Sequence, residues 1–553
     1  MSDDRHEAYT RPFEDLSLAD VPDVGGKNAS LGEMIRIASD LAIRVPAGFA
    51  TTAAAYRAFL GENELEDPIR RLVKAMRAGE ISLSEAGSEI RRRMLEGEVP
   101  PRVAEDIREA YRELSRRHDM EALDVAIQSS ATAEDLPEAS FAGQQESFLN
   151  IRGPDAVVDS CRRCFASLFT DRAISYREER DFDHLDIALS VGIQKMVRSD
   201  EASAGVLFTL DPDTGFPDVV VIAAAWGLGE SVVKGNVSAD QYVVFKPVLD
   251  EHGMVPILSR DRGSKEEKIV YDANHSGGTV TWPTSSEERR RLCLDDDQVL
   301  TLARWGRALE EHYGYPLDIE WALDGRDERL YVVQARPETV HARQDAAAVL
   351  RSYTLRERPT PLVSGTAVGD AVVHGEVCRL QSPREIDRFR PGGILVTERT
   401  DPDWGPILGV AGGVVTEQGS RTSHAAIVSR ELGIPAVVGA GDAREALSDG
   451  QEVTLSCAEG DRGFVYDGHV PFDAVDEKVD DLPETRTRLM INLGNPAAAF
   501  RWWRLPIRGI GLARIEFIIG EIIQVHPMAL LHPEQVQDED DRERIRELSR
   551  GHS

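Results

Sequence analysis

The order of apolar and polar positions between residues 413 and 435 predicts a strand, a turn and a helix. The β-branched run Gly413–Thr416 is typical of a strand, and the chain breaks at Gly419. A helical pattern then runs to the stop at Gly433-Ile434-Pro435. Because N–H groups and the positive end of the helix dipole meet at a helix N-terminus, we expect an anion to be favoured there.

The N-terminal 340 residues mix the two kinds of pattern. Charged helical stretches fill residues 55–120, whereas short alternating or apolar runs predict sheet strands. The clearest of these runs are 123–127, 192–197, 205–209, 317–322 and 330–337. We therefore predict an α/β multidomain protein whose first half, residues 1–340, forms two lobes of roughly 1–195 and 196–340.

The remaining residues divide at two stretches that are rich in charge and proline. We predict a linker at 341–361, a small β/α domain at 362–468, an acidic linker at 469–487 and a further unit at 488–553. A domain with a flexible segment at each end is able to move between two places.

Composition excludes several classes of protein. The 96 acidic and 64 basic residues give a formal charge of −32, which argues against binding to a nucleic-acid backbone. Five scattered cysteines do not form a dense disulfide framework, so we expect a reducing compartment. The start of the chain does not resemble a signal peptide, and no apolar run reaches the roughly 20 residues of a membrane span. We therefore expect a cytoplasmic protein without a nucleic-acid or membrane partner.

His424 falls in the first turn of the predicted helix, beside the hydroxyls of Ser420, Thr422 and Ser423. A neutral imidazole, whose ordinary pKa is about 6.5, is able to attack phosphorus and become phosphorylated. A lone histidine at this place more often caps or packs a helix, so the position alone leaves both interpretations open.

Two segments of the first half have the features of a phosphate site. Gly25-Gly26-Lys27 precedes a helical pattern, so free N–H groups and a lysine charge are available to a phosphate, although an ordinary turn has the same signature. On the run 317–322, Asp318 and Glu320 share one face of a strand and suit a divalent cation that bridges phosphate oxygens. On the run 330–337, Gln334 and Arg336 also share a face. A solvated sheet edge is the alternative for this group.

The stretch Thr416–Gly439 closely resembles the phosphohistidine signature of the PEP-utilising enzymes, and Thr400-Asp-Pro-Asp-Trp404 makes the likeness strongest to the phosphoenolpyruvate synthases (pyruvate, water dikinases). The resemblance implies an ATP-grasp-like half that holds Mg²⁺ and ATP, and a swivelling domain on which His424 is phosphorylated. It implies the reaction ATP + pyruvate + water → AMP + phosphoenolpyruvate + phosphate, with a role in gluconeogenesis.

The resemblance also assigns residues. It implies nucleotide contacts from Lys27, Arg172, Thr209, Glu230, Gln334 and Arg336, metal binding by Asp318 and Glu320, support of the phosphohistidine by Arg421, Thr422 and Ser423, and substrate binding by Arg514. For Arg172 alone, the alternative is a surface ion pair with Asp171 or Glu178. Two positions depart from the family pattern: Gln128 replaces an arginine, and Ser420 replaces a second glycine.

Residues 488–553 resemble the opening of the family's (β/α)₈ pyruvate-binding barrel, which needs about 250 residues. We therefore expect a chain that is truncated within the barrel and retains only the ATP and phosphohistidine half-reaction. Three alternatives stay open: an inactive or regulatory fragment, the N-terminal subunit of an enzyme completed by a separate barrel chain, or a phosphotransferase to another acceptor, of the antibiotic or pyruvate phosphate dikinase type. A homo-oligomer is a further expectation.

Overall fold

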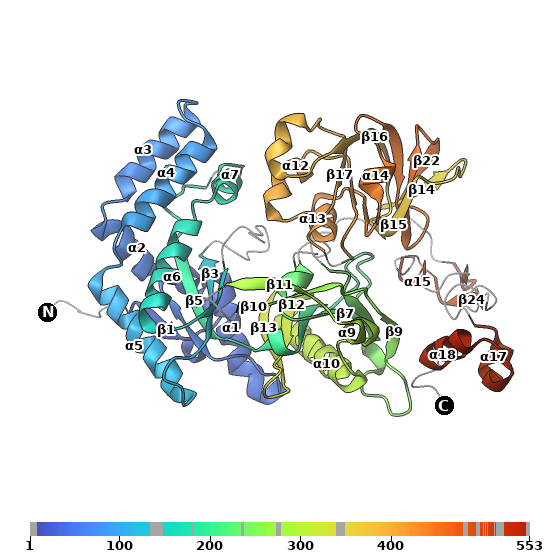
Figure 1. Ribbon diagram of the computed structural model, residues 1–553, viewed down its shortest axis with the longest axis horizontal. Coiled ribbons are helices and arrows are strands. Elements are labelled where there is room, and N and C mark those ends of the chain that lie inside the picture. The colour runs from blue at the N-terminus through green and yellow to red at the C-terminus, as the bar shows by residue number, and fades with distance from the viewer. Residues whose placement is uncertain are drawn as a thin grey trace.

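The computed structural model describes residues 8–132, 147–179, 182–233, 237–272, 278–338, 349–421, 423–478, 485–493, 498–501, 503, 505, 507–513, 515 and 525–548. Figure 1 shows two lobes side by side, a barrel domain above the second lobe, and a C-terminal segment at the far end from the first lobe. The predicted α/β multidomain fold class, with a separate small β/α domain, is confirmed, whereas the predicted domain bounds stay a prediction. Among the helices of the described residues, none is both long enough and apolar enough to cross a bilayer.

The first lobe is built on a five-stranded antiparallel sheet in the order β1-β2-β5-β3-β4. Its strands are β1 (Thr10–Pro12), β2 (Gly48–Thr51), β3 (Val125–Ala131), β4 (Ser147–Ile151) and β5 (Leu189–Lys195). Its helices are α1 (Val21–Leu41), α2 (Ala53–Glu62), α3 (Glu66–Arg77), α4 (Leu83–Glu96), α5 (Pro101–Arg117), α6 (Pro154–Ser167) and α7 (Asp171–Glu179). Apolar residues of α2 to α7 and of the sheet belong to one core, in which α3 and α4 pack on the other helices.

The second lobe has a six-stranded antiparallel sheet in the order β13-β12-β6-β7-β8-β9. Its strands are β6 (Ser203–Phe208), β7 (Val219–Trp226), β8 (Asp240–Phe245), β9 (Ile257–Asp261), β12 (Leu317–Leu323) and β13 (Leu330–Pro337), and β10 (Glu267–Tyr271) pairs with β11 (Thr279–Pro283) as a separate ribbon. Its helices are α8 (Glu230–Val233), α9 (Ser286–Arg290) and α10 (Asp296–Tyr313). Helix α10 begins at a capping box from Asp295 and ends at Gly314, whose φ is +77°.

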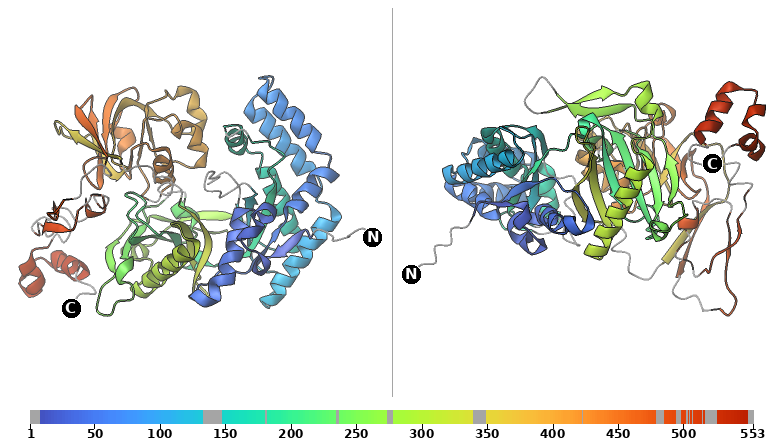
Figure 2. Two further views of the ribbon diagram at one scale, coloured as in Figure 1. Left: turned by 180° about the vertical axis from the view of Figure 1, so that it is seen from behind. Right: turned by 90° about the horizontal axis from the view of Figure 1, so that it is seen from below.

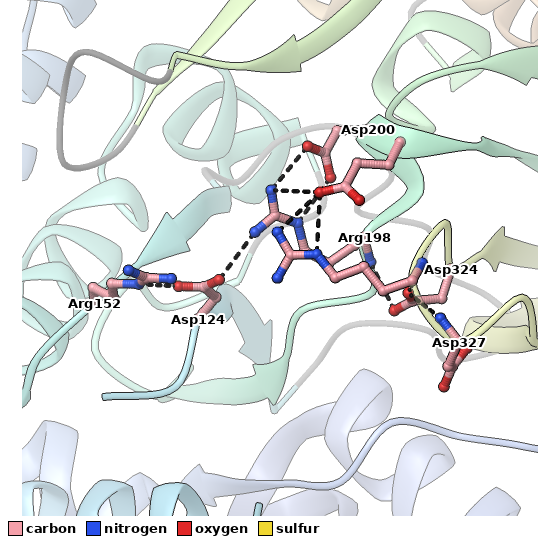
Figure 3. Close-up of polar contacts among 8 residues, drawn as sticks. Asp124, Arg152, Arg198, Asp200, Asp324 and Asp327 are labelled. Carbon is pink, nitrogen blue, oxygen red and sulfur yellow. Dashed lines mark hydrogen bonds and ion pairs between the residues drawn. The ribbon is translucent and has the colours of Figure 1, made fainter. Parts of the chain in front are cut away.

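The two lobes share a core and a network of charges. Apolar residues of α1 belong to the same cluster as residues of β7, β8 and α10. Figure 3 shows Arg198 at this junction: its Nη1 donates to Asp124 of the first lobe at 3.1 Å, and its N–H donates to Asp324 of the second lobe at 3.0 Å. The same guanidinium forms a fork with Asp200. These contacts hold the two lobes in a fixed orientation relative to each other.

The barrel domain is a closed sheet in the order β15-β19-β18-β17-β16-β20-β21, and the strands β16 to β19 pair in parallel. Its strands are β15 (Val363–Val368), β16 (Val372–Arg379), β17 (Ile394–Thr397), β18 (Gly413–Thr416), β19 (Ala436–Val438), β20 (Glu452–Ser456) and β21 (Arg462–Asp467), and its helices are α12 (Gly405–Leu408), α13 (His424–Leu432) and α14 (Ala443–Ala446). β-Branched side chains fill the interior, and a second cluster lies beneath α12 and α13.

A two-stranded antiparallel ribbon joins the segments that enter and leave the barrel domain. It consists of β14 (Val349–Leu355) and β22 (Phe472–Lys478). Arg351 pairs with Asp476 across the ribbon, and Arg356 pairs with Asp473 at 2.6 Å. Both strands lie within segments for which the sequence predicted linkers without secondary structure. The difference arises because these linkers face each other, so each supplies the hydrogen-bonding partner that neither has alone.

The C-terminal segment starts with two parallel strands, β23 (Ile491–Leu493) and β24 (Ile510–Ala513), with helix α15 (Ala498–Arg501) between them in the chain. Two helices follow, α17 (Pro527–Leu531) and α18 (Glu539–Leu548), and Figure 2 shows them apart from the lobes in both of its views. A strand, helix and parallel strand are the elements that open a β/α barrel. The predicted barrel start is compatible with this arrangement and stays a prediction.

Candidate functional site

His424 lies where the sequence analysis places it, at the first residue of α13, after strand β18. Ser423 is the N-cap, and its hydroxyl accepts a hydrogen bond from the N–H of Ala426. The turn between strand and helix passes through Gly419, whose φ of +120° suits only glycine. The predicted strand, turn and helix are therefore confirmed, and the imidazole stands at a helix N-terminus.

One ring nitrogen of His424 is engaged inside the barrel domain. Its Nδ1 lies 3.1 Å from the hydroxyl of Thr400, which is buried. Burial, followed by the positive charge of Arg172, lowers the pKa of His424 to about 4. The ring is therefore neutral near pH 7. In the tautomer in which Nδ1 carries the proton and donates it to the Thr400 hydroxyl, Nε2 has a free lone pair and is able to act as a nucleophile.

Arg172 contacts the barrel domain from the first lobe. Its Nε lies 3.2 Å from Asp403 in the short helix Pro402–Trp404. The carboxylates considered as surface partners are paired elsewhere, because Asp171 binds Arg91 at 3.0 Å and Glu178 binds Arg77 at 2.8 Å. The arginine thus faces the domain that carries His424.

The carboxylates on β12 and the polar residues on β13 lie opposite each other, as the alternation predicts. The register pairs Asp318 with Arg336 and Glu320 with Gln334. Nε and Nη2 of Arg336 donate to Oδ2 of Asp318 at 3.0 and 2.8 Å. A β-bulge follows Glu320 and shifts the register beyond the site. This register agrees with the prediction that Asp318 and Glu320 share a face of β12 and that Gln334 and Arg336 share a face of β13.

Glu320 lies at the centre of a cluster of charges from both lobes. Its burial, and then the nearby charge of Asp318, raise its pKa, whereas Arg336 and Lys27 act in the opposite direction. Glu230, the first residue of α8, is near enough to add to the rise. The structure thus brings together five of the predicted nucleotide and metal residues.

The carboxylates of this cluster fit a divalent cation. Oδ1 of Asp318 is buried and, among the described residues, has no hydrogen-bond partner. The pKa of Glu320 beside it is raised, first by burial and then by the like charge of Asp318. The described part of the chain contains no group of three or more typical metal-ligating side chains. Because a divalent cation takes six or more oxygen ligands, one held by Asp318 and Glu320 would need phosphate oxygens or water as its other ligands.

Lys27 follows a kink in α1. Gly25 has a φ of +73° and lies directly against Ser130 of β3, where a Cβ atom would collide with the serine. The N–H of Asn28 donates to the Ser130 hydroxyl at 3.4 Å. The glycine-lysine segment thus packs against the hydroxyl-rich end of β3. The charge of Lys27 in this segment is close enough to Glu320 to act on its pKa. Gln128, which replaces the family's arginine, lies half-buried on the same strand.

Four predicted residues are held by other contacts or lie outside the described residues. Thr209 is fully buried beside the end of β6: its hydroxyl accepts from the N–H of Leu317 at 2.8 Å, and its carbonyl accepts from Lys246 at 2.7 Å. Arg421 forms ion pairs with Asp213 and Asp461. Thr422 and Arg514 lie outside the described residues.

Four residues of the site region were given no role by the sequence analysis. Thr400 and Asp403 lie in the quoted Thr400–Trp404 motif, which supported the resemblance without revealing what each side chain contacts. Asp213 and Arg430 form an ion pair between the second lobe and the barrel domain. No periodic pattern signals such a pair, because its two members lie on separate domains.

Comparison with known proteins yields matches along most of the chain. Residues 21–357 match the family model described as "Pyruvate phosphate dikinase, AMP/ATP-binding domain", and residues 389–460 match "PEP-utilising enzyme, mobile domain". The chain is 46% identical over 550 residues to the phosphoenolpyruvate synthase of Aquifex aeolicus, covering 97% of this chain and 64% of that protein. It is 46% identical to that of Synechocystis (97% and 67%) and 49% identical to that of Pseudomonas aeruginosa (95% and 66%). The chain therefore spans about two thirds of the length of these relatives.

Proposed function

The chain belongs to the phosphoenolpyruvate synthase family, and from this premise and the geometry of the two centres we propose that it transfers a phosphoryl group from ATP to His424. The observation that carries the proposal is the placement of His424. Its imidazole is neutral, Nδ1 is held by Thr400, and Arg172 of the nucleotide-binding half stands near it. A nucleophile of this kind needs a bound phosphate donor, and the charge cluster around Glu320 supplies a place for one.

In the proposed step Nε2 of His424 attacks the β-phosphorus of ATP. An N–P bond forms while the bond between the β-phosphorus and the oxygen bridging to the α-phosphate breaks, and AMP leaves with that oxygen. Water then cleaves the link between the β- and γ-phosphates. Inorganic phosphate is released, and one phosphoryl group remains on the imidazole.

The charged residues have separate tasks in this proposal. Lys27 and Arg336 balance the phosphate charges from the nucleotide side, and Arg172 does so near His424. Gln334 and Glu230 position the nucleotide. Asp318 and Glu320 hold Mg²⁺, which when bound neutralises charge on the phosphates. Ser423 and the N-terminus of α13 stabilise the phosphohistidine.

We extend the proposal to the complete reaction through the relatives, whose shared name is phosphoenolpyruvate synthase. The phosphoryl group would pass from His424 to the enolate oxygen of pyruvate, which gives phosphoenolpyruvate and frees the imidazole. Arg514 would bind the carboxylate of that substrate. The barrel domain has to move between the two reactants, and its attachment through the β14–β22 ribbon is compatible with such a movement.

Labelled ATP tests the first step. We expect acid-labile label on the chain from β-³²P-ATP but not from γ-³²P-ATP, its location at His424 by peptide mapping, and its loss in His424→Gln. Absence of β-label on the wild-type chain, with ATP bound, would refute the proposal.

Addition of pyruvate tests the second step. Release of labelled phosphoenolpyruvate supports the complete reaction for this chain. Stable label that pyruvate does not discharge supports the half-reaction alone, and discharge after addition of a separate barrel chain supports a split enzyme. Discharge to a different acceptor, such as phosphate or an antibiotic, would assign the chain to another branch of the family.

A further inference from the structure

The turn between β6 and β7 is a rigid structure held by its own first residue. The carboxylate of Asp211 accepts hydrogen bonds from the N–H groups of Asp213 at 2.8 Å and Thr214 at 3.3 Å. The N–H of Asp211 donates to the carbonyl of Phe216 at 2.9 Å, and Gly215 has a φ of +69°. The turn is therefore ordered by its backbone, and the carboxylate of Asp213 is left for partners outside it.

Asp213 binds two arginines of the barrel domain. Arg430 of α13 donates from Nε at 2.8 Å and also from Nη2, and Arg421 lies 3.3 Å from the other carboxylate oxygen. The side chains of Asp213 and Arg430 are only 15% and 6% exposed. Burial of this ion pair has a desolvation cost of its own, but removal of one partner leaves a buried charge without compensation, which is strongly unfavourable.

The contact continues from Arg430 to the segment that leads to His424. Nη1 of Arg430 donates to the carbonyl of Arg421 at 2.6 Å. Arg421 stands three residues before His424 in the chain, and Ser423 between them caps the helix. A guanidinium held by Asp213 therefore fixes the backbone on the N-terminal side of the imidazole.

A second contact of opposite polarity fixes the orientation of the barrel domain. Arg172 of the first lobe pairs with Asp403 of the barrel domain. Asp213 of the second lobe pairs with Arg421 and Arg430 of the barrel domain. A barrel domain docked in the reverse orientation would bring like charges together. Complementary charges of this kind determine which orientation is bound.

We propose that Asp213 is a positioning residue for His424. Through Arg430 and Arg421 it docks the barrel domain on the second lobe and sets the imidazole toward the nucleotide. This inference rests on the proposed function, because it assigns to Asp213 the productive docking for phosphoryl transfer. Movement of the barrel domain to a second reactant breaks the pair.

Single-turnover kinetics of the full chain test the proposal with Asp213→Asn, which keeps the shape of the side chain and removes its charge. We expect transfer from β-³²P-ATP to His424 to slow at least about tenfold, whereas the Kd of ATP is unchanged. The wild-type rate should also fall with added salt more steeply than the rate of the variant. A wild-type rate in Asp213→Asn would overturn the proposal.

Asp250→Asn is the matched control. Asp250 also pairs with two arginines, Arg304 and Arg307, but all three residues belong to the second lobe and the carboxylate is exposed. Asp250→Asn should transfer the phosphoryl group from ATP to His424 at the wild-type rate.

A double-mutant cycle separates positioning from a general defect of the turn. If Asp213 acts through Arg430 and Arg421, adding Asp213→Asn to the double variant Arg421→Gln/Arg430→Gln should slow the transfer no further. If the two losses multiply instead, Asp213 acts by another route and the proposal fails.

X-ray scattering in solution tests docking without any chemistry, so it distinguishes failure of this inference from failure of the proposed function. At low salt Asp213→Asn should have a larger radius of gyration than the wild type and Asp250→Asn. The same radius of gyration in all three chains would refute the docking contact even if His424 becomes labelled. A larger radius in Asp213→Asn alone would support the docking contact even if His424 does not become labelled.

Discussion

Nε of Arg172 lies 3.2 Å from Oδ1 of Asp403, although the two residues belong to different domains. Arg172 is on α7 of the first lobe, and Asp403 precedes α12 of the barrel domain. The same arginine lies close enough to His424 to help lower its pKa. One guanidinium therefore contributes both to docking and to the protonation state of the imidazole.

The pKa of His424 should depend on this arginine. We expect a value of about 4 in the wild type and a higher value in Arg172→Met, still below 6.5 because burial, the larger cause, remains. Between pH 6.5 and about 4 the unfolded imidazole binds a proton that the folded one does not, so this contribution to stability is complete above pH 6.5 and is lost as the pH falls toward 4. NMR titration of ¹³C-histidine measures both values.

His424→Gln identifies the resonance in that titration. A wild-type midpoint near 6.5, or an unchanged midpoint in Arg172→Met, would contradict the assigned role of the arginine.

Thr400 should matter for the rate of transfer rather than for nucleotide binding. Thr400→Val keeps the volume of the buried side chain but removes the hydrogen bond to Nδ1 of His424. A hydrogen bond contributes about 1 kcal/mol net, so we expect roughly a fivefold to tenfold slower phosphorylation at an unchanged Kd for ATP. Thr400→Ser retains the hydroxyl and should stay near the wild-type rate; equal rates for the valine and serine variants would disprove the role.

Glu320 should cost stability when no cation is bound. Because its pKa is raised in the folded chain, its contribution is favourable below the ordinary value of about 4.3 and is lost as the pH rises. We expect Glu320→Gln to raise the Tm at pH 8 without Mg²⁺ by about 2 °C, with a smaller difference at pH 5. Thermal denaturation with and without Mg²⁺ and ATP measures this.

Mg²⁺ and ATP should then stabilise the wild type more than Glu320→Gln. The exposed Glu311, on α10, gives a control variant, Glu311→Gln, that should follow the wild type. Equal stabilisation of all three chains would remove Glu320 from the metal site.

Gly419 should be the least replaceable glycine near His424. A Cβ atom there would lie 2.9 Å from the Ser423 hydroxyl, on a backbone with a φ of +120°. We expect Gly419→Ala to lower the free energy of unfolding of the barrel domain by more than about 2 kcal/mol, whereas Gly433→Ala, with a φ of +69° and open space, should cost about 1 kcal/mol. Urea denaturation monitored by hydrogen exchange in α13 compares them, and equal losses would contradict the steric argument.

The sequence predicted those parts of the site that depend on local order. Strand β18, Gly419 and the start of α13 follow one another in the chain, so periodicity and the glycine suffice to predict them. The shared face of Asp318 and Glu320 follows from the two-residue repeat of a strand.

Contacts between distant segments could not be predicted in this way. Thr400 reaches His424 only because β17 and β18 are neighbours in the barrel, and Asp213 meets Arg430 only when two domains dock. The hydrogen bond that the Thr209 hydroxyl accepts from the N–H of Leu317 likewise joins segments far apart in the sequence, whereas the predicted nucleotide contact of Thr209 stays a prediction.

The ribbon of β14 and β22 has a consequence for how the barrel domain turns. Since the strands that enter and leave the barrel domain pair with each other, the domain is attached through one two-stranded ribbon rather than through two separate linkers. A rotation of the domain about this ribbon would carry His424 along an arc whose radius is the distance from the ribbon to α13. An acceptor that this imidazole reaches by such a rotation would lie on that arc.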